Sequence, residues 1–278
     1  MVTADIRAVF VDLDDTFLAP DKSIPAANLA LMDELCARGI ELVPCTGRHV
    51  GGIPEAMRAH PGVRHVVASN GAVVRDMRSG DDVRVVDIPR NEVRGLYAQL
   101  VDQPLVFDVF ADGRAYTEQA RFHRFDQIDV PEGLRSYLKR ARTPVSQTIP
   151  ELLPLLGPVT KIALFFMDAA SARACREALA HHPSLYYVQT SAATYEVMDV
   201  HATKGAALEW LCARMGWSAS QTVAFGDNNN DASMIEAAGD GVVMENGEPQ
   251  VKALADHIAP PAAEGGVALY LQHLVHGA

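Results

Sequence analysis

The first part of the chain is a series of short apolar runs, each of which ends abruptly in polar residues. The run from Ala8 to Val11 is continuous, as expected of a strand that is buried on both faces of a sheet. Between the runs, apolar residues recur at helical spacing, and Gly39 stands where a helix C-cap belongs. The pattern predicts a β-α-β-α-β segment, with strands at 8–11, 40–45 and 66–68, a helix over 26–38 and another helix that ends near Met57.

The last part of the chain repeats this pattern. A helical stripe formed by Leu208, Leu211, Cys212 and Met215 precedes an apolar run over 223–225. Alternation of this kind indicates an α/β fold with a doubly wound, Rossmann-like parallel sheet, which binds ligands beyond the C-terminal ends of its strands. The other predicted elements here are a helix over 232–238, a strand at 242–244 and helical segments near 248–255 and 267–275.

Between about Val85 and Gln189 the alternation gives way to mixed strand, turn and helix signals. We interpret this segment as an inserted α+β cap domain, with turn signals at Gly80-Asp81-Asp82 and Ser191-Ala192-Ala193 as its hinges. The predicted domains are therefore a core of residues 1–84 and 191–278 and a cap of residues 85–190. The elements predicted in the cap are helices over 92–101 and 132–140 and strands at 105–110, 116–118 and 161–166.

The composition and the charge narrow the class of protein. With 49% hydrophobic and 21% charged residues, the chain is typical of a globular protein and not of a disordered chain or a coiled coil. Its 24 Lys and Arg against 35 Asp and Glu give a net charge of -11, which repels nucleic acid and anionic lipid. No apolar run approaches the roughly 18 residues of a membrane span, and the start of the chain lacks a signal-like segment. We therefore expect a cytoplasmic protein without nucleic acid or membrane partners.

The cysteines do not form a recognisable disulfide or zinc pattern. They stand far apart without a Cys-x-x-Cys pair, which is typical of reduced thiols in a core. The cysteines are Cys36, Cys45, Cys175 and Cys212.

Two carboxylates, Asp12 and Asp14, follow the first predicted strand. Residues two apart in extended backbone face the same side, so both could serve one site. Like charges so placed need a counterion, and Mg²⁺ is a hard cation that binds carboxylates, waters and phosphate oxygens. An acidic loop in which the aspartates only form caps and turns is the alternative for this motif alone.

A second acidic cluster, Gly226 to Asp231, follows the strand at 223–225. Asp231 is placed to cap the next helix, which gives it an adequate structural role. Asp227 does not cap that helix, and the preceding Gly226 lets the backbone turn close to a ligand. Asp227 is therefore the better candidate for a metal ligand.

Three other polar residues lie where a phosphate could bind. Lys204 opens a predicted helix, where the helix dipole disfavours a cation, and a phosphate held between Lys204 and the helix N-terminus would offset this. Thr46 and Asn70 end two predicted strands and could donate to phosphate oxygens, with plain turn chemistry as the alternative.

Together, these motifs resemble those of the haloacid dehalogenase superfamily of phosphohydrolases. Within it, the chain resembles the Cof-type subfamily, class IIB, which carries a large cap inserted after the third core strand. Asp12 to Thr16 looks like the first motif of the superfamily, Thr46-Gly47-Arg48 like the second, Lys204-Gly205 like the third and Gly226 to Asp231 like the fourth. The resemblance spans the whole chain.

The resemblance implies an Mg²⁺-dependent phosphatase of small phosphate esters, with sugar phosphates as the leading substrates. It implies that Asp12 is the nucleophile that forms an aspartyl-phosphate and that Asp14 is the general acid and base. It also implies that Mg²⁺ is held by the Asp12 and Asp227 carboxylates and the Asp14 backbone carbonyl, with Asp231 in support. The phosphoryl group would be bound by Thr46, Gly47, Lys204 and Asn230, and the further candidates for phosphate or substrate contacts are Arg48, Asn70 and Asn246.

Two positions depart from the pattern of the family. Asp15 stands where members usually have Gly, and Asn246-Gly247 stands where they usually have Asn-Ala. Asp15 adds a negative charge near the nucleophile, which either weakens phosphate binding or points outward.

Other functions share parts of this pattern. Phosphoryl transfer to a sugar, as in phosphotransferases and phosphomutases of the same superfamily, would use the same residues. A phospho-receiver signalling domain also combines Asp, Thr and Lys on a doubly wound sheet, but here a whole inserted domain separates the two carboxylate clusters. Within the insertion, Arg121 to Phe125 offers cations beside aromatic rings to a sugar phosphate, with a half-buried amphipathic segment as the alternative.

Overall fold

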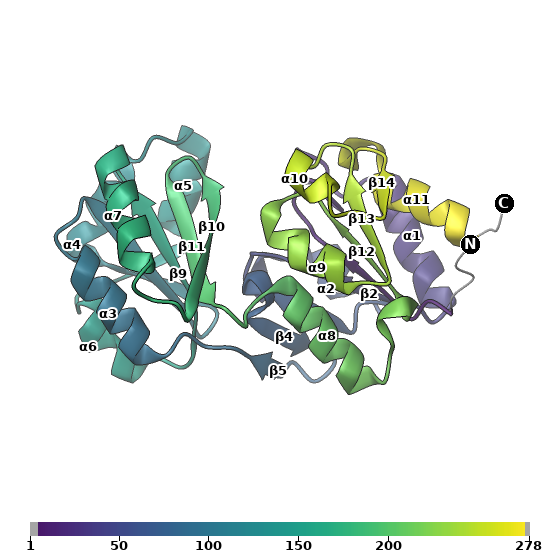
Figure 1. The fold of residues 1–278 in the computed structure, drawn as a ribbon, viewed down its shortest axis with the longest axis horizontal. Helices are drawn as coiled ribbons and strands as arrows, with labels where there is room; N and C mark the ends of the chain where they lie inside the picture. Colours follow the sequence, from purple (N-terminus) through teal and green to yellow (C-terminus); the bar gives the residue numbers. More distant parts are fainter. Residues whose placement is uncertain (1–4, 276–278) are drawn as a thin grey trace. The chain divides into compact units, whose positions relative to one another are not determined.

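The computed structural model describes the backbone of residues 5–275 and the side chains of residues 5–272. The chain divides into two compact units, unit 1 (Met1–Arg84 and Ala202–Ala278) and unit 2 (Val85–His201). The colours in Figure 1 show that unit 1 combines the first part of the sequence with the last. The prediction that no signal segment begins the chain rests partly on residues 1–4, which lie outside the described residues.

Unit 1 is built on a parallel sheet with the strand order β14-β13-β12-β1-β2. The central strand is β1, because Ala8 pairs with both Glu41 and Thr222. Every residue of β1 is buried, as its continuous apolar run predicts. The strands are β1 (Ala8–Val11), β2 (Glu41–Pro44), β12 (Thr222–Gly226), β13 (Asp240–Met244) and β14 (His257–Ala259).

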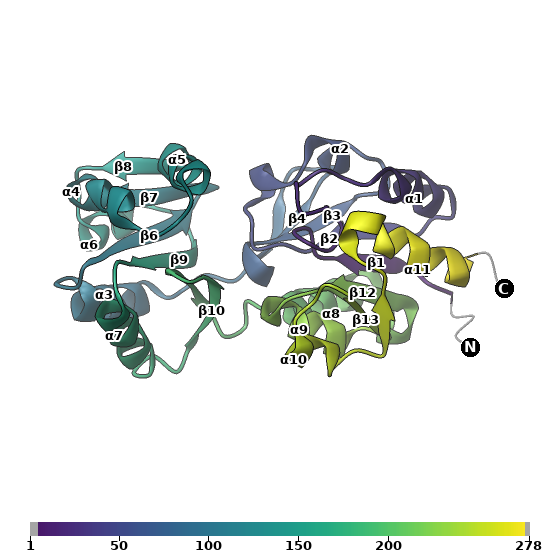
Figure 2. The ribbon, with the colours of Figure 1, turned by 90° about the horizontal axis from the view of Figure 1, so that it is seen from above.

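Helices cover both faces of this sheet. Val9 and Val11 pack against α1 and α11, whereas Ala8 and Phe10 pack against α8 and α9. Figure 2 shows these two pairs of helices on opposite sides of the sheet, which confirms the predicted doubly wound α/β fold. The helices of unit 1 are α1 (Ala26–Ala37), α2 (Glu55–Arg58), α8 (Lys204–Met215), α9 (Ala232–Ala237), α10 (Pro249–Lys252) and α11 (Gly266–Val275).

The helix predicted to end near Met57 is shorter than a continuous helix after β2 would be. The structure has a 3-10 turn at Val50–Gly52, followed by α2 as a single short turn. Gly51, Gly52 and Pro54 explain the break, because glycine and proline are the poorest helix formers.

After α2 the chain forms β3 (His65–Ala68), β4 (Val73–Asp76) and β5 (Asp82–Val85). β3 lies beside β2, which it contacts through a parallel bridge between Cys45 and Val67. β4 and β5, which the sequence pattern did not predict, are short and partly exposed, so they lack a continuous apolar run. The chain enters unit 2 from β5.

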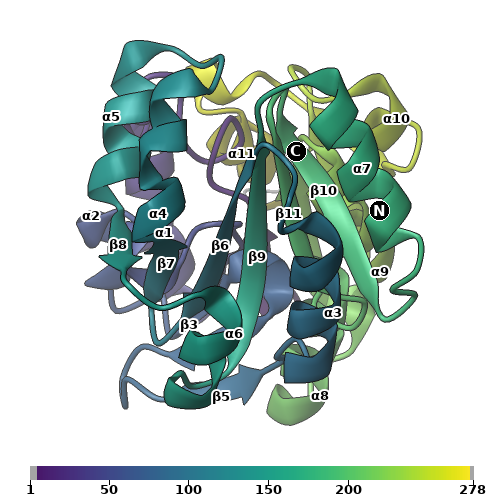
Figure 3. The same cartoon turned by 90° about the vertical axis from the view of Figure 1, so that its left-hand side faces the viewer.

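Unit 2 is an α+β domain with the sheet order β10-β11-β9-β6-β7-β8. Its strands pair antiparallel except for β7 and β8, which are parallel. Figure 3 shows α3 and α7 in front of this sheet. The elements are β6 (Leu105–Ala111), β7 (Arg114–Glu118), β8 (Arg142–Val145), β9 (Val159–Phe166), β10 (Leu185–Ser191), β11 (Thr194–Asp199), α3 (Arg90–Leu100), α4 (Gln119–Phe122), α5 (Glu132–Arg140), α6 (Ile149–Leu152) and α7 (Ala169–Leu179).

The second boundary of unit 2 differs from the predicted one. The predicted hinge Ser191-Ala192-Ala193 is the turn of a hairpin, in which Ser191 of β10 pairs with Thr194 of β11. Because β11 also pairs with β9, residues 191–201 belong to unit 2 and not to the core. The first boundary, between Arg84 and Val85, coincides with the predicted one.

The segment from Arg121 to Phe125 contributes to the interior of unit 2. Arg121 forms an ion pair with Glu118 at 2.8 Å, and Arg124 donates to two backbone carbonyl groups. The Phe125 side chain is fully buried. These contacts favour the structural interpretation of this segment over a sugar phosphate site.

The cysteines are free thiols, in agreement with the prediction of reduced residues. Cys45, Cys175 and Cys212 are buried, and Cys36 is partly exposed. Within the described residues, no helix is both long enough and apolar enough to cross a membrane.

Candidate active site

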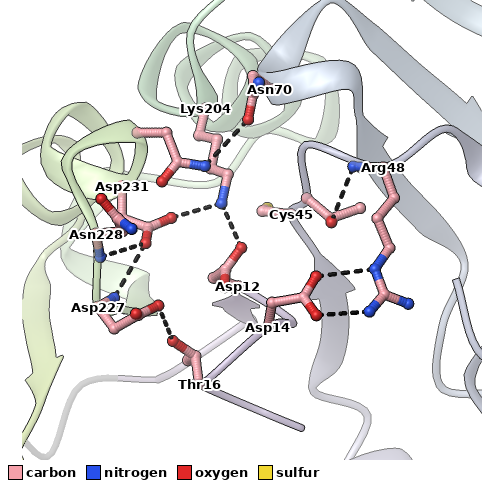
Figure 4. Close-up of polar contacts among 12 residues, drawn as sticks. Asp12, Asp14, Thr16, Cys45, Arg48, Asn70, Lys204, Asp227, Asn228 and Asp231 are labelled. Atoms are coloured by element: carbon pink, nitrogen blue, oxygen red, sulfur yellow. Dashed lines mark hydrogen bonds and ion pairs between the residues drawn. The ribbon is translucent and has the colours of Figure 1, made fainter. Parts of the chain in front are cut away.

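Polar side chains from four segments meet at the C-terminal edge of the sheet of unit 1. They come from the loops after β1, β2 and β12 and from the first residue of α8, as Figure 4 shows. This is the edge at which the alternation of strands and helices predicts a ligand site.

At the centre of the site, Lys204 lies between two carboxylates. Its Nζ is 2.5 Å from Oδ1 of Asp12 and 2.5 Å from Oδ1 of Asp231. The Lys204 and Asp231 side chains are fully buried, and Asp12 is nearly so. Burial acts to lower the pKa of Lys204, but the two carboxylates outweigh it and raise this pKa above its usual value. Lys204 is therefore a fixed cation beside Asp12.

The position of Lys204 follows from the start of α8. Thr203 is the N-cap of this helix, and its Oγ1 accepts a hydrogen bond from the Ala206 N–H at 3.0 Å. A cation at this end of a helix is disfavoured by the dipole. In the structure the carboxylates of Asp12 and Asp231 compensate for it, whereas the sequence analysis assigned this role to a bound phosphate.

Asp231 organises the loop that carries Asp227. Its Oδ2 accepts hydrogen bonds from the backbone N–H groups of Asp227 and Asn228, both at 3.0 Å. Asp231 stands at the N-cap position of α9 but makes no capping hydrogen bond, so the predicted capping role is wrong. Gly226 is required here, because a Cβ on it would lie 2.4 Å from the Cβ of Asp231.

Thr16 is a member of this site that the sequence analysis left without a role. The fully buried Thr16 donates from Oγ1 to Oδ1 of Asp227 at 2.9 Å, and so fixes the orientation of that carboxylate. The sequence offered only its place in the motif from Asp12 to Thr16, because the backbone turns at Asp15 and simple alternation of sides does not apply there.

The Asp14 side chain does not contact Lys204, the partner of Asp12, but points toward Arg48 (Figure 4). Arg48 donates to both Asp14 oxygens, from Nε at 2.8 Å and from Nη2 at 2.6 Å, and Nζ of Lys22 lies 3.1 Å from Oδ1. Burial acts to raise the pKa of Asp14, but Arg48 and Lys22 outweigh it and hold this pKa below its usual value. Asp14 is therefore a carboxylate at neutral pH in this conformation.

Asp15, which stands where the family usually has Gly, adopts a positive φ of 62°. This backbone region favours glycine, which gives a physical reason for the usual residue. The Asp15 carboxylate is partly exposed and lies 3.3 Å from Nζ of Lys22. Its charge is thus directed to a surface lysine, although it still adds to the rise in the pKa of Asp227.

The residues after β2 and β3 form a buried wall of the site. Thr46 accepts a hydrogen bond at Oγ1 from the Arg48 N–H at 3.1 Å. Asn70 accepts one at Oδ1 from Nδ2 of Asn230 at 3.1 Å. A side chain at Gly47 would meet Asn70, which lies within 2.9 Å of the Cβ position. The structure therefore brings Thr46, Gly47, Asn70 and Asn230 together.

Asn246 is exposed, and its amide holds two loops together. Its Nδ2 donates to the Asp15 carbonyl at 2.8 Å, and its Oδ1 accepts from the Ala262 N–H at 3.0 Å. Both ends of the amide are thus engaged by the backbone. Asn246 acts on the site through the loop after β1, and these bonds do not support the predicted phosphate contact.

The acidic side chains form a cluster with the properties of a cation site. Carboxylate oxygens of Asp12, Asp227 and Asp231 all lie within 4.8 Å of one another. Burial, with the charge of Asp231, raises the pKa of Asp227 to about 7. Burial also raises the pKa of Asp12. Lys204 opposes this rise, and Asp227 and Asp231 add to it. An all-oxygen donor set with this excess of negative charge fits a hard divalent cation such as Mg²⁺.

Comparisons with known proteins point to one family. The family model described as haloacid dehalogenase-like hydrolase matches residues 9–271. A putative phosphatase of Streptococcus pyogenes is 27% identical, over 95% of this chain and 96% of its own. The pyridoxal phosphate phosphatase of Escherichia coli is 25% identical, over 97% of this chain and 99% of its own. The HAD subclass IIB sugar phosphatase BT4131 shares the fold, with a TM-score of 0.80 and 20% identity over 97% of this chain and 99% of its own.

Proposed function

The chain belongs to the haloacid dehalogenase-like hydrolase family, and from this premise we propose that it hydrolyses small phosphate monoesters with Mg²⁺, through a phosphoryl group carried on Asp12. It is a phosphatase of small phosphorylated metabolites. The observation that supports the assignment of the nucleophile is the contact of Asp12 with the buried Lys204 at the end of the central strand.

In the first step, a carboxylate oxygen of Asp12 attacks phosphorus and forms a P–O bond. The bond from phosphorus to the ester oxygen breaks, and its electron pair stays with the leaving alcohol, which takes a proton from Asp14. In the second step, water attacks phosphorus, Asp14 takes its proton, and the bond between phosphorus and Asp12 breaks. Inorganic phosphate leaves, and both aspartates return to their starting states.

Lys204 and the buried wall bind the phosphoryl group in this proposal. Lys204 carries a fixed positive charge 2.5 Å from the attacking carboxylate, so it can hold Asp12 in place and stabilise the charge on the phosphoryl oxygens. Thr46 and Asn230 supply hydroxyl and amide groups nearby. Such preorganised donors stabilise the transition state without reorganising during the reaction.

Mg²⁺ would be held by the carboxylates of Asp12 and Asp227 and by the backbone carbonyl of Asp14. When bound, it neutralises negative charge on the phosphoryl oxygens. Asp231 already accepts hydrogen bonds at both oxygens, from Lys204 and from two backbone N–H groups. Its role is therefore to shape the loop of Asp227, while Thr16 orients the Asp227 carboxylate.

Removal of the metal tests this assignment. We expect a chelator to abolish phosphate release and added Mg²⁺ to restore it. Ca²⁺ should inhibit, because it takes more ligands at longer distances and misplaces the attacking oxygen. Asp227→Asn should raise the Mg²⁺ concentration for half-maximal activity, whereas Asp240→Asn, on β13 and outside the cluster, should not. Full activity in excess chelator would contradict the metal assignment.

The general acid must leave the position that the structure describes. Asp14 is held as a carboxylate by Arg48, so in this conformation it can accept a proton but cannot donate one. We therefore propose that, before the acid step, Asp14 gives up its contact with Arg48 and takes a proton from solvent, and that the base step needs no such movement.

Asp14→Asn provides a test of this acid, through the leaving group. We expect kcat for alkyl phosphates to fall by about 10²–10⁴, because their poor leaving groups need a proton. For an activated aryl phosphate, the rate of the first step should fall much less. The rate of the initial burst of phenol release measures this step. Equal losses in the first step for alkyl and aryl substrates would argue against Asp14 as the acid.

The substrate class is the finer part of the proposal. We propose that unit 2 selects the leaving group and that sugar phosphates are accepted. The family accommodates other esters, since the relative from E. coli acts on pyridoxal phosphate. A panel of phosphorylated metabolites, assayed for phosphate release with and without Mg²⁺, tests the function. Loss of substrate without equivalent inorganic phosphate would indicate phosphoryl transfer, the rival activity.

A further inference from the structure

The loop of residues 69–71, after β3, contacts several segments that carry the proposed phosphate-binding groups. The Asn70 N–H donates to the carbonyl oxygen of Thr46 at 3.0 Å, and the Ser69 N–H donates to that of Arg48 at 2.9 Å. The Asn70 side chain accepts from Asn230. A displacement of this loop would therefore move groups on more than one side of the site.

The same loop also packs against the start of α8. Gly71 has a φ of 105°, and a Cβ on it would lie 2.1 Å from the carbonyl oxygen of Thr203 and 2.8 Å from the backbone nitrogen of Lys204. Only glycine permits this conformation and this approach. Because no space separates the two backbones, the position of Gly71 determines where Thr203 and Lys204 lie.

Arg84 holds the Gly71 peptide at its carbonyl oxygen. It is the last residue of unit 1 before the chain enters unit 2, and its Nη1 donates to the Gly71 carbonyl oxygen at 2.6 Å. Arg84 is half-buried, and burial lowers the pKa of its guanidinium. The two points at which the chain crosses between the units, at β5 and before α8, can be followed in Figure 1. Arg84 lies at the first crossing and Thr203 lies just after the second. Residues of unit 1 next to both crossings thus contact Gly71.

We propose that Arg84 is a positioning residue that, through Gly71, fixes the start of α8 and so the placement of Lys204 for phosphate. The proposal rests on the function proposed above, because it assigns Lys204 to the phosphoryl group. Arg84 touches neither substrate nor metal in this scheme. Its loss allows the Gly71 peptide to turn, and the ammonium of Lys204 then meets the phosphoryl group less well.

The test measures inorganic phosphate binding by calorimetry, and kcat and KM for an aryl phosphate, on the full chain with Mg²⁺. We expect Arg84→Met to weaken phosphate binding and to lower kcat/KM, each by about tenfold, since small misplacements at such sites are costly. Arg84→Lys, which keeps a donor on a long side chain, should recover most of both. If Arg84→Met does not fold, Arg84→Gln takes its place under the same criteria.

The matched control is Arg75→Met. Arg75 on β4 forms a two-bond ion pair with Asp82 on β5, at 2.7 and 2.9 Å, so its loss also loosens β5 but leaves Gly71 alone. We expect Arg75→Met to bind phosphate as the wild type does, although its melting temperature should change about as much as that of Arg84→Met. Equal phosphate binding by Arg84→Met and Arg75→Met would overturn the proposal. A wild-type protein that releases no phosphate from any ester would instead refute the underlying function, and the proposal with it.

Discussion

Asp12→Asn is expected to lower kcat by a factor on the order of 10⁶, the scale seen when an enzyme loses its nucleophile. The amide keeps the shape of the side chain but cannot attack phosphorus. Stability should change little, because the substitution removes one negative charge from a crowded acidic cluster while Asp231 still pairs with Lys204. Phosphate release at saturating substrate and thermal melting measure the two effects.

The control for this variant is Asp21→Asn, in the loop that follows. Asp21 is exposed and accepts a hydrogen bond from the Ser23 N–H at 2.9 Å, so it tests the loss of an aspartate in the same region. It should keep full activity. Substantial turnover by Asp12→Asn, in material free of wild-type protein, would exclude an intermediate on Asp12.

Lys204→Met is expected to damage both activity and stability. The substitution leaves Asp12 and Asp231 buried without their shared cation, and loss of one partner of a buried ion pair costs about 3–5 kcal/mol. Loss of a preorganised charge at the phosphoryl group should also lower kcat/KM by about 10²–10³. Urea unfolding and steady-state kinetics measure these effects. Lys252→Met, a surface lysine that donates to the Glu245 carbonyl, is the control that should leave both unchanged.

The instability of Lys204→Met should depend on pH in a defined direction. Burial raises the pKa of Asp12, and without Lys204 nothing described at this carboxylate opposes the rise. A group whose pKa is higher in the folded state stabilises the fold at low pH, and this stabilisation is lost as the pH rises through the folded pKa. With chelator present, the loss in free energy of unfolding of Lys204→Met relative to wild type should therefore be smaller at about pH 5 than at about pH 8. A deficit that does not change with pH would show that the aspartates stay ionised or reach solvent.

The core fold could be predicted from sequence where burial alone decides the pattern. β1 and β12 are continuous apolar runs because helices cover both faces of their sheet, and such runs are easy to recognise. β10 and β11 were not predicted, because a turn signal at residues 191–193 is the same for a hairpin as for a domain boundary. Only the pairing of β11 with β9, which is remote in sequence, separates the two.

Candidate residues of the site could be predicted, but their contacts could not. Asp12, Lys204 and Asp227 follow from strand ends and a helix start, which sequence patterns indicate. The use of Asp231 in place of a helix cap, and the pairing of Asp14 with Arg48, depend on which side chains meet across the sheet edge. No spacing rule in one sequence reports such contacts.

The order of the units along the chain has a consequence for synthesis. The catalytic sheet cannot close until β12 is made, because β12 pairs with β1 at its centre, whereas unit 2 is complete at residue 201. A ribosome therefore releases the inserted domain as a finished folding unit while the surrounding one still lacks three of the five strands of its sheet. During that interval Asp12 and Asp14 already exist, but Lys204 and Asp227 do not. If Asp12 is the nucleophile, as proposed, the nascent chain carries it without Lys204 and Asp227 until residue 227 has been added.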